Sequence, residues 1–378
     1  MITIKDKSQC CGCTACAQVC AKHCITPTED EEGFLYPRVN ADLCTDCHLC
    51  EQVCPVVNQD IARKPLGVYA AKSQDETIRS TSSSGGIFTA LAESVIDEGG
   101  VVFGVRLDED LRAVHAWTDT KEGLEPFRGS KYVQSKVGNS FTQVKTFLKE
   151  GRQVLFSGTP CQVAGLRKFL VRDYPNLLTV DVACHGVPSP KVWRTYLSTI
   201  AGSEAVARVS FRDKSTGWKK YSFTAYGADH VILSQPTTVN TYLQGFVRDL
   251  YLRPSCHACP AKQFKSGSDI TIADFWGFEY YYPDKNDDKG VSLVMANSDK
   301  GSGAIARLRG ISIFEADYQD ALRYNPSIVN SSQVPEAREV FWRHFEEYGM
   351  DAVRIALRPS LSSILRRCKE RIRKILRP

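Results

Sequence analysis

Eight cysteines near the start of the chain are spaced like the ligands of iron–sulfur clusters. Cys10, Cys13, Cys16 and Cys20 read C-x2-C-x2-C-x3-C, and the same spacing recurs 34 positions later. The second copy ends in a proline and consists of Cys44, Cys47, Cys50 and Cys54. In two-cluster ferredoxins, three closely spaced thiolates bind one 4Fe–4S cubane and the fourth binds the cubane of the other half. The chemistry that this pattern predicts is one-electron transfer.

The repeat predicts two crossed ligand sets. The first set takes its last member from the second copy and consists of Cys10, Cys13, Cys16 and Cys54. The second set is the mirror case and consists of Cys44, Cys47, Cys50 and Cys20. Zinc ribbons and disulfides are the alternatives, but zinc sites use cysteines in pairs rather than in runs of four. Cys11 and Cys24 have no counterpart in the other copy, so we expect them to be small buried side chains.

Four cysteines farther along the chain form another candidate metal site. Cys161 and Cys184 each follow a predicted strand, and Cys256 and Cys259 form a C-x2-C pair. Four thiolates complete the ligand set of a third 4Fe–4S cluster or of a zinc ion. Scattered cysteines are also common as buried small side chains without a metal. Because the chain already carries cluster motifs, we favour a third 4Fe–4S cluster.

Alternating strand and helix patterns must position these residues. At 378 residues the chain is long enough for a small cluster module and one or two larger domains. Beyond a polar segment at 58–67, strand patterns at 67–71, 101–105 and 177–183 alternate with helix patterns such as 85–98. This alternation indicates an α/β region with a mixed or mostly parallel sheet.

Three loops at predicted strand–helix junctions carry candidate cofactor-binding residues. Hydroxyl groups and backbone amides at the start of a helix suit a phosphate group, and the first loop holds Ser83, Ser84, Gly85 and Gly86. A plain serine N-cap is the alternative interpretation. The second loop has the cation, aromatic ring and amide that a flavin site needs, although a surface turn fits equally well. Its candidates are Ser130, Lys131, Tyr132 and Gln134.

The third loop and one acidic residue complete the candidate set. Gly158 and Thr159 lie between a predicted strand and the helix that begins near Cys161. Asp274 follows the strand pattern at 270–273, where its carboxylate could accept a hydrogen bond from a ribose or a flavin ring edge. Capping of the following turn is the other role that Asp274 suits.

Taken together, these segments resemble the family of coenzyme F-420 hydrogenase/dehydrogenase beta subunits. The resemblance is carried by the duplicated cysteines and by five further stretches, namely SSSGG at 82–86, GSKYVQS at 129–135, SGTPCQ at 157–162, CHGVPSP at 184–190, and Cys256 to ADFWG at 273–277. It implies an iron–sulfur flavoprotein that passes electrons between clusters and a deazaflavin or other acceptor. It further implies FAD near the first three of these five stretches, and it supports the third cluster.

The fold class predicted from these observations is an α+β ferredoxin-like two-cluster module followed by an α/β flavin-binding region with a mixed sheet. We divide the chain into a ferredoxin domain at 1–62 and, at 63–150, the N-terminal α/β region typical of these beta subunits. Their C-terminal region, with the third cluster and flavin site, follows at 151–330, and a helical basic tail at 331–378.

The charge of the chain is uneven. Of the net charge of +5, residues 354–378 contribute +8, so the remainder is mildly acidic and gives no sign of a nucleic-acid cleft. Apolar residues recur at helical spacing between 361 and 376 with arginines and lysines between them. This tail predicts a terminal helix that packs on the domain, or a peripheral contact with an anionic membrane or a partner protein. The need for reduced thiols favours the cytoplasm.

The leading functional hypothesis is an iron–sulfur flavoprotein oxidoreductase. In it, a redox partner protein or other electron donor reduces the clusters, and the electrons pass to FAD and on to an organic or deazaflavin acceptor. One alternative is an electron-transfer subunit of a larger redox complex without its own substrate. Another is a non-redox accessory protein of surface-polysaccharide synthesis, a setting in which some members of the family occur.

Overall fold

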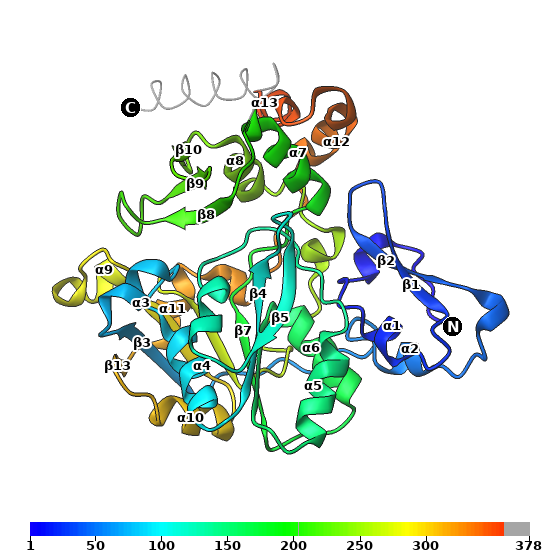
Figure 1. Cartoon of the computed structure of the whole chain (residues 1–378), viewed down its shortest axis with the longest axis horizontal. Coiled ribbons are helices and arrows are strands. Elements are labelled where there is room, and N and C mark those ends of the chain that lie inside the picture. Colours follow the sequence, from blue (N-terminus) through cyan, green and yellow to red (C-terminus); the bar gives the residue numbers. More distant parts are fainter. Residues whose placement is uncertain (203, 359–378) are drawn as a thin grey trace, which may run out of the picture.

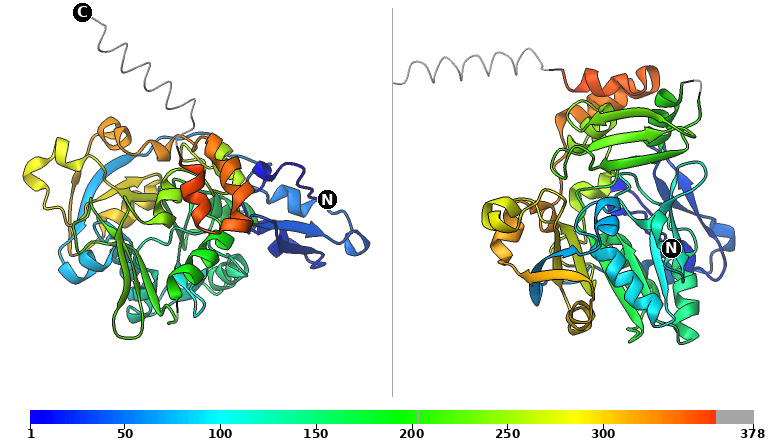
Figure 2. Two further views of the ribbon diagram at one scale, coloured as in Figure 1. Left: turned by 90° about the horizontal axis from the view of Figure 1, so that it is seen from above. Right: turned by 60° about the vertical axis from the view of Figure 1, so that its left-hand side comes forward.

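A cysteine module, a large mixed sheet and a smaller lobe above one edge of that sheet make up the molecule (Figures 1 and 2). The computed structural model describes residues 1–202 and 204–358. The predicted basic helix at 361–376 lies outside the described residues. In the described part of the chain, no helix combines the length and the hydropathy that a membrane span requires.

The cysteine module keeps the symmetry of its sequence repeat. Helix α1 (Ala15–Val19) belongs to the first copy and α2 (Leu49–Gln52) to the second. The residues that precede them, Thr14 and His48, are 34 positions apart and both adopt left-handed backbone conformations, with φ of 60° and 58°. Between the copies, β1 (Ile25–Glu29) and β2 (Leu35–Val39) form an antiparallel hairpin, which confirms the short strands expected there.

The large sheet has eight strands in the order β13-β3-β12-β11-β7-β6-β4-β5. Its four central neighbours β11, β7, β6 and β4 are parallel, and the flanking strands are antiparallel to their neighbours. The strands are β3 (Gly67–Ser73), β4 (Val101–Leu107), β5 (Ala113–Thr118), β6 (Val154–Gly158), β7 (Leu177–Val182), β11 (Ile270–Asp274), β12 (Ser292–Ala296) and β13 (Ile311–Glu315). The expected mixed sheet is confirmed, and regions 63–150 and 151–330 both contribute strands to it.

Helices cover both faces of this sheet. Apolar side chains of α4 (Ile87–Asp97) and α10 (Asp299–Ala306) pack on one face. On the other face, α5 (Ser140–Lys149) and α6 (Pro160–Leu170) pack over the central strands. Three short helices complete this part of the molecule, namely α3 (Glu76–Thr81), α9 (Phe278–Tyr281) and α11 (Tyr318–Arg323).

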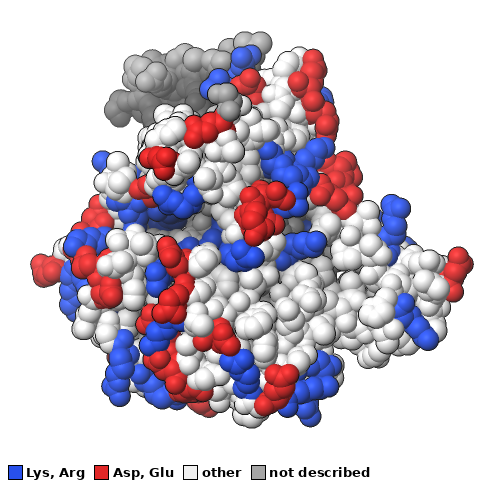
Figure 3. All heavy atoms as spheres, viewed as in Figure 1, with Lys and Arg blue, Asp and Glu red and all other residues white. Residues whose placement is uncertain are grey.

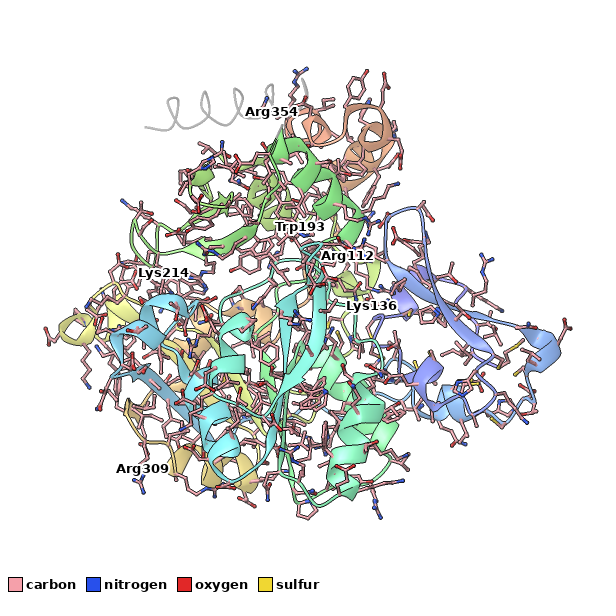
Figure 4. The ribbon with its side chains drawn as sticks, in the orientation of Figure 1. Arg112, Lys136, Trp193, Lys214, Arg309 and Arg354 are labelled. Atoms are coloured by element: carbon pink, nitrogen blue, oxygen red, sulfur yellow. The ribbon has the colours of Figure 1, made fainter. Side chains whose placement is uncertain are left out.

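The smaller lobe contains a three-stranded antiparallel sheet that the sequence analysis did not anticipate. Its strands lie in the order β10-β9-β8, with bounds β8 (Arg208–Asp213), β9 (Ser222–Tyr226) and β10 (Val231–Pro236). Four helices pack around it in one apolar core that includes Trp193 and Phe341. They are α7 (Pro190–Ala201), α8 (Thr241–Val247), α12 (Glu336–Tyr348) and α13 (Asp351–Ala356). Figure 4 shows Trp193 in the interior of this lobe.

The topology brings the candidate loops to one edge of the large sheet. Strands β6, β7 and β11 are parallel neighbours, so their carboxyl ends, at Gly158, Val182 and Asp274, meet at the same edge. In open α/β sheets this edge is where ligands bind. The smaller lobe lies over this edge, so residues from both parts meet there (Figure 1).

Candidate functional site

The first predicted cysteine set surrounds one pocket, which we call the inner pocket. Cys10, Cys13, Cys16 and Cys54 all line it. The rest of its lining is largely apolar and includes Ile2, Ile4 and Val56. Burial raises the pKa of the Cys16 thiol to about 12, because a lone thiolate is unfavourable there. The residues fit a cubane cluster, whose irons supply the positive charge that such thiolates need.

The second predicted set lies at the solvent side of the module, and we call it the outer set. Cys20, Cys44 and Cys50 pack in one cluster of side chains with Cys24. The thiol of Cys24 lies 3.3 Å from that of Cys20. Cys47, by contrast, is exposed to solvent. The outer set therefore has the ligand types of a second cubane with one side open to solvent.

Four distant cysteines meet in another pocket, which we call the middle pocket. Cys161 lies at the start of α6, Cys184 follows β7, and Cys256 and Cys259 lie at a 3-10 helix at 254–258. All four line this pocket. Thr159 Oγ1 lies 3.3 Å from Cys161 Sγ, and burial raises the pKa of the Cys184 thiol to about 12.

The thiols surround the middle pocket without converging on one point. In residues 1–202 and 204–358, no three His, Cys, Asp or Glu side chains are close enough together to hold a single metal ion. A cubane has a different requirement, because each of its four irons binds one thiolate at its own corner.

The inner and middle pockets share a wall. Cys11 lines both pockets, and both Cys13 and Cys161 act on its thiol through hydrogen bonds. Cys11 is buried, as expected from sequence, but its position between two ligand sets was not foreseen. Arg253 lines the middle pocket and also lies against Cys10. Nothing in the sequence around Arg253 marks it as a site residue.

Several candidate flavin-binding residues gather where the smaller lobe meets the sheet edge. Ser83 and Ser130 share a hydrogen bond of 2.8 Å between their hydroxyl groups, and Ser83 Oγ accepts from the Ser130 amide at 2.6 Å. Asp274 accepts from Trp218 Nε1 at 3.0 Å and pairs with the buried Arg212 of β8. Tyr132 lies near this pair, since both charges influence its phenol.

A buried lysine adds positive charge to this junction. Lys214 follows β8 and donates to the carbonyl oxygens of Arg79 at 2.6 Å, Lys289 at 3.0 Å and Ser84 at 3.3 Å. Burial lowers the pKa of Lys214 to about 8, with help from nearby arginines. Figure 4 places Lys214 between the lobe and the sheet, and Figure 3 shows Lys and Arg side chains along the hollow there. Neither Arg212 nor Lys214 was a candidate from sequence.

The remaining candidate residues have structural partners of their own. Gly85 packs tightly, since an added Cβ would lie 2.4 Å from the Ala71 carbonyl, and its amide donates to Ser292 Oγ. Gly86 is the left-handed N-cap of α4, with φ of 86°. Lys131 donates to two carbonyl oxygens, those of Pro126 and Arg128, at 2.8 Å.

The third loop and Gln134 lie on the side of the cysteine pockets. Thr159 caps α6 in a capping box with Gln162. An added Cβ at Gly158 would lie 3.4 Å from the buried ring of His115. Gln134 donates to the Cys11 carbonyl at 3.1 Å and accepts from Arg253 at 2.9 Å. Gln134 is therefore part of the wall between two cysteine pockets.

The fold and the cysteine sets define an iron–sulfur protein with a mixed α/β body. Its N-terminal module matches the family of 4Fe–4S dicluster domains over residues 9–58. Residues 68–141 match the N-terminal part, and residues 151–318 the C-terminal part, of the coenzyme F420 hydrogenase/dehydrogenase beta subunit. The chain belongs to this family of beta subunits.

Individual relatives are distant in sequence. One subunit of the F(420)H(2) dehydrogenase of Methanosarcina mazei is 25% identical over 273 residues, which are 66% of this chain and 71% of that protein. An uncharacterised protein of Methanocaldococcus jannaschii is 23% identical over 198 residues, covering 44% of this chain and 54% of its own length. A chain of the F420-reducing NiFe hydrogenase complex of Methanosarcina barkeri is 19% identical, with a TM-score of 0.48, 70% of this chain covered and 91% of that chain.

Proposed function

We propose that this protein transfers electrons between a redox partner protein and an organic acceptor, with three 4Fe–4S clusters and FAD as its cofactors. The clusters, when bound, supply one-electron transfer, and the flavin exchanges one-electron for two-electron chemistry. The observation that carries the proposal is the shared wall between the inner and middle pockets. Electron transfer needs neighbouring redox centres, and Cys11 lines both pockets.

The chain's own residues give the proposed route a direction. Cys47 of the outer set is exposed, so a partner protein can approach that end. The inner set is more deeply buried, with Cys13 at 6% and Cys54 at 8% exposure. The middle pocket adjoins the end of β7 and the start of α6, beside the edge of the sheet. The order outer, inner, middle therefore runs from the surface towards the ligand-binding edge.

Support for the flavin comes from the junction of lobe and sheet. Ser83, Ser130, Arg212 and Lys214 bring hydroxyl groups and buried positive charge to one place. Such groups suit the pyrophosphate of a dinucleotide. The aromatic pair Trp218 and Trp276 stacks beside them at 5.0 Å. A flavin or deazaflavin ring system is the class of ligand that this combination favours.

A relative supports the proposed partner and acceptor. The Methanosarcina mazei protein is named as one subunit of an F(420)H(2) dehydrogenase. By analogy with that name, we propose a deazaflavin of the F420 type as the acceptor class and a larger redox complex as the partner. In such a complex this chain acts as the component that connects the donor to the acceptor.

Analysis of the anaerobically purified full-length chain tests the cofactor content. We expect about twelve irons, equal amounts of sulfide and one FAD per chain, because each cubane holds four irons. The C256S variant should lose about four irons and keep the EPR signals of the N-terminal pair. C24S is the matched control, and its iron content should equal that of the wild type. Zinc in place of the third set of irons would contradict the proposal, as would a colourless protein without flavin.

A further inference from the structure

A buried arginine connects two of the cysteine pockets. Arg253 has no surface exposed to solvent and lines the middle pocket. Its Nη2 atom lies 3.5 Å from the thiol of Cys10, which lines the inner pocket. Its Nε atom donates to the Cys10 carbonyl oxygen at 2.6 Å. One guanidinium therefore faces the ligands of both pockets.

The guanidinium is held in place by neutral groups. Nη1 donates to Gln134 Oε1 and Nη2 donates to the Leu35 carbonyl oxygen, both at 2.9 Å. The rings of Phe34 and Tyr36 lie 5.3 and 4.3 Å from its central carbon. Its position is thus fixed from several sides, and the aromatic faces shield it from water.

A glycine makes room for this arrangement. Gly12 adopts φ of 74°, and an added Cβ there would lie 2.7 Å from Arg253 Nη1 and 2.8 Å from Gln134 Nε2. The loop that carries the first cysteines is therefore shaped around the arginine. This close fit indicates a built site rather than an incidental contact.

The charge of Arg253 is balanced by thiols. The negative groups that act on it most strongly are those that Cys10, Tyr36, Cys11 and Cys256 would carry, and none of them is a carboxylate. A buried cation needs an opposing charge, since the cost of taking it out of water is several kcal/mol. Thiolates that bind a cluster provide that opposing charge for Arg253 from two sides.

A fixed cation close to a cluster changes its redox equilibrium. The reduced cluster carries one more negative charge than the oxidised cluster, so a nearby positive charge favours the reduced form. Hydrogen bonds to ligand sulfurs act in the same direction, and both are known determinants of cluster potential. The outer set is not among the groups that Arg253 contacts, so its potential should respond less.

We propose that Arg253 raises the reduction potentials of the inner and middle clusters together, relative to that of the outer cluster. Electrons that enter at the exposed outer cluster then favour the two buried centres. The inference rests on the proposed function, because it assumes that all three cysteine sets hold 4Fe–4S clusters. It makes Arg253 a positioning and tuning residue, because it acts through ligands and does not react.

A redox titration of the full-length protein, followed by EPR, tests this role. R253M removes the charge and keeps much of the side-chain volume. We expect two of the three reduction steps to move to lower potential, by at least a tenfold change in the reduced-to-oxidised ratio at fixed potential. For a one-electron couple this change equals about 59 mV. The third step should stay within a twofold change of its wild-type ratio.

R309M is the matched control. Arg309 is exposed and lies far from the cysteine module (Figure 4). Its replacement removes the same charge from the protein without touching the pockets, so all three reduction steps should keep their wild-type potentials. Equal shifts in R309M and R253M would show that net charge alone is responsible, and would overturn the proposal.

Two further variants keep the test decisive if R253M fails to retain its iron. Q134E places a carboxylate of the same size against the guanidinium and should lower the same two potentials. R253K keeps the charge but loses the fork of donors, so its shift should be smaller than that of R253M. Wild-type potentials in a fully loaded Q134E protein would refute the role of Arg253. A wild-type protein with only eight irons would instead refute the proposed function, before any variant is compared.

Discussion

The two copies of the cysteine repeat have the same spacing but lie in different surroundings. The inner copy packs into the core of α5 and α6, where Cys13 and Cys54 are buried. The outer copy lies at the surface, with Cys47 exposed and Leu43 beside it 55% exposed. Ligand identity alone therefore does not distinguish the two predicted clusters. Their difference must come from burial, neighbouring charge and access of water, which are the terms that tune cluster potentials.

Contacts with the large sheet account for the burial of the inner copy. Gln18 Oε1 accepts hydrogen bonds from the amides of Phe141 and Thr142 at the start of α5, at 3.0 and 3.2 Å. Gly165 of α6 lies against Cys13. The outer copy instead makes exposed ion pairs, in which the N-terminal amine lies 2.8 Å from Asp46 and 3.2 Å from Glu51. Exposed pairs of this kind contribute little to stability.

Removal of one crossed ligand from each set should give the largest effect. C54S takes a ligand from the inner set, and C20S takes one from the outer set. Each variant should lose about four irons, but C54S should also unfold at a clearly lower temperature, because the inner cluster lies within the shared core. Iron analysis and thermal unfolding followed by circular dichroism measure both quantities. Equal melting temperatures in the two variants would break the comparison.

A methyl group added to α6 should affect the inner copy alone. In G165A the new Cβ would lie 2.7 Å from Cys13 Cβ and 2.9 Å from Cys13 Sγ. Overpacking of this kind costs about 1–3 kcal/mol, and here it should also displace a cluster ligand. We expect partial loss of the inner cluster in EPR spectra, with the outer signal intact.

G303A is the control for this variant. Gly303 also lies in a helix, α10, but an added Cβ would meet only Arg307 Nη1, at 3.6 Å. Alanine is favoured over glycine by about 1 kcal/mol in a helix interior, so G303A should be neutral or slightly stabilising. Full retention of the inner cluster in G165A would show that the close contact with Cys13 is not needed.

Exposure should also separate the two copies in their rates of iron loss. An iron chelator or brief contact with oxygen should attack the outer cluster several-fold faster, since oxidation of cysteine ligands follows their exposure. The decay of the two EPR signals in one sample provides an internal reference. Simultaneous decay would indicate that the outer copy is protected in solution, for instance by a partner or a second copy of the chain.

The ligand sets could be predicted from sequence because their spacing is local. The third set was also within reach, since Cys161 and Cys184 follow β6 and β7, and parallel neighbours end at one edge. Cys11 and Arg253 were not recognised as partners, because their contact depends on how the module docks on α6. That docking depends on residues such as Gly165, which is 154 positions from Cys11 in sequence. No local pattern encodes such a contact.

The smaller lobe was missed for a different reason. Strands β8 and β10 both contain irregular register against β9, at Ser210/Asp213 and at Val231/Leu233. A bulge interrupts the alternation of buried and exposed side chains by which a strand is recognised in sequence. Arg212 and Lys214 belong to this segment, so the basic part of the candidate flavin site was missed with it. The hydroxyl groups of Ser83 and Ser130 lie in loops with clear strand–helix context, and these were found.

The smallest expected effect concerns the hairpin between the two copies. Arg338 of α12 donates to Glu32 with Nη1 at 2.8 Å, and both side chains are 14% exposed. R338M leaves Glu32 partly buried without its partner, which should cost about 1–2 kcal/mol, less than the ~3–5 kcal/mol of a fully buried pair. Amides at 30–34 should then exchange faster with solvent in hydrogen-exchange measurements. R343M is the control on the same helix, because the pair of Arg343 with Glu339 is exposed on both sides and its loss should change little. If R338M loosens the hairpin while both clusters keep their iron and potentials, the inner copy owes its protection to α6. If the inner cluster changes as well, the hairpin and its arginine clamp are part of what makes the two copies differ.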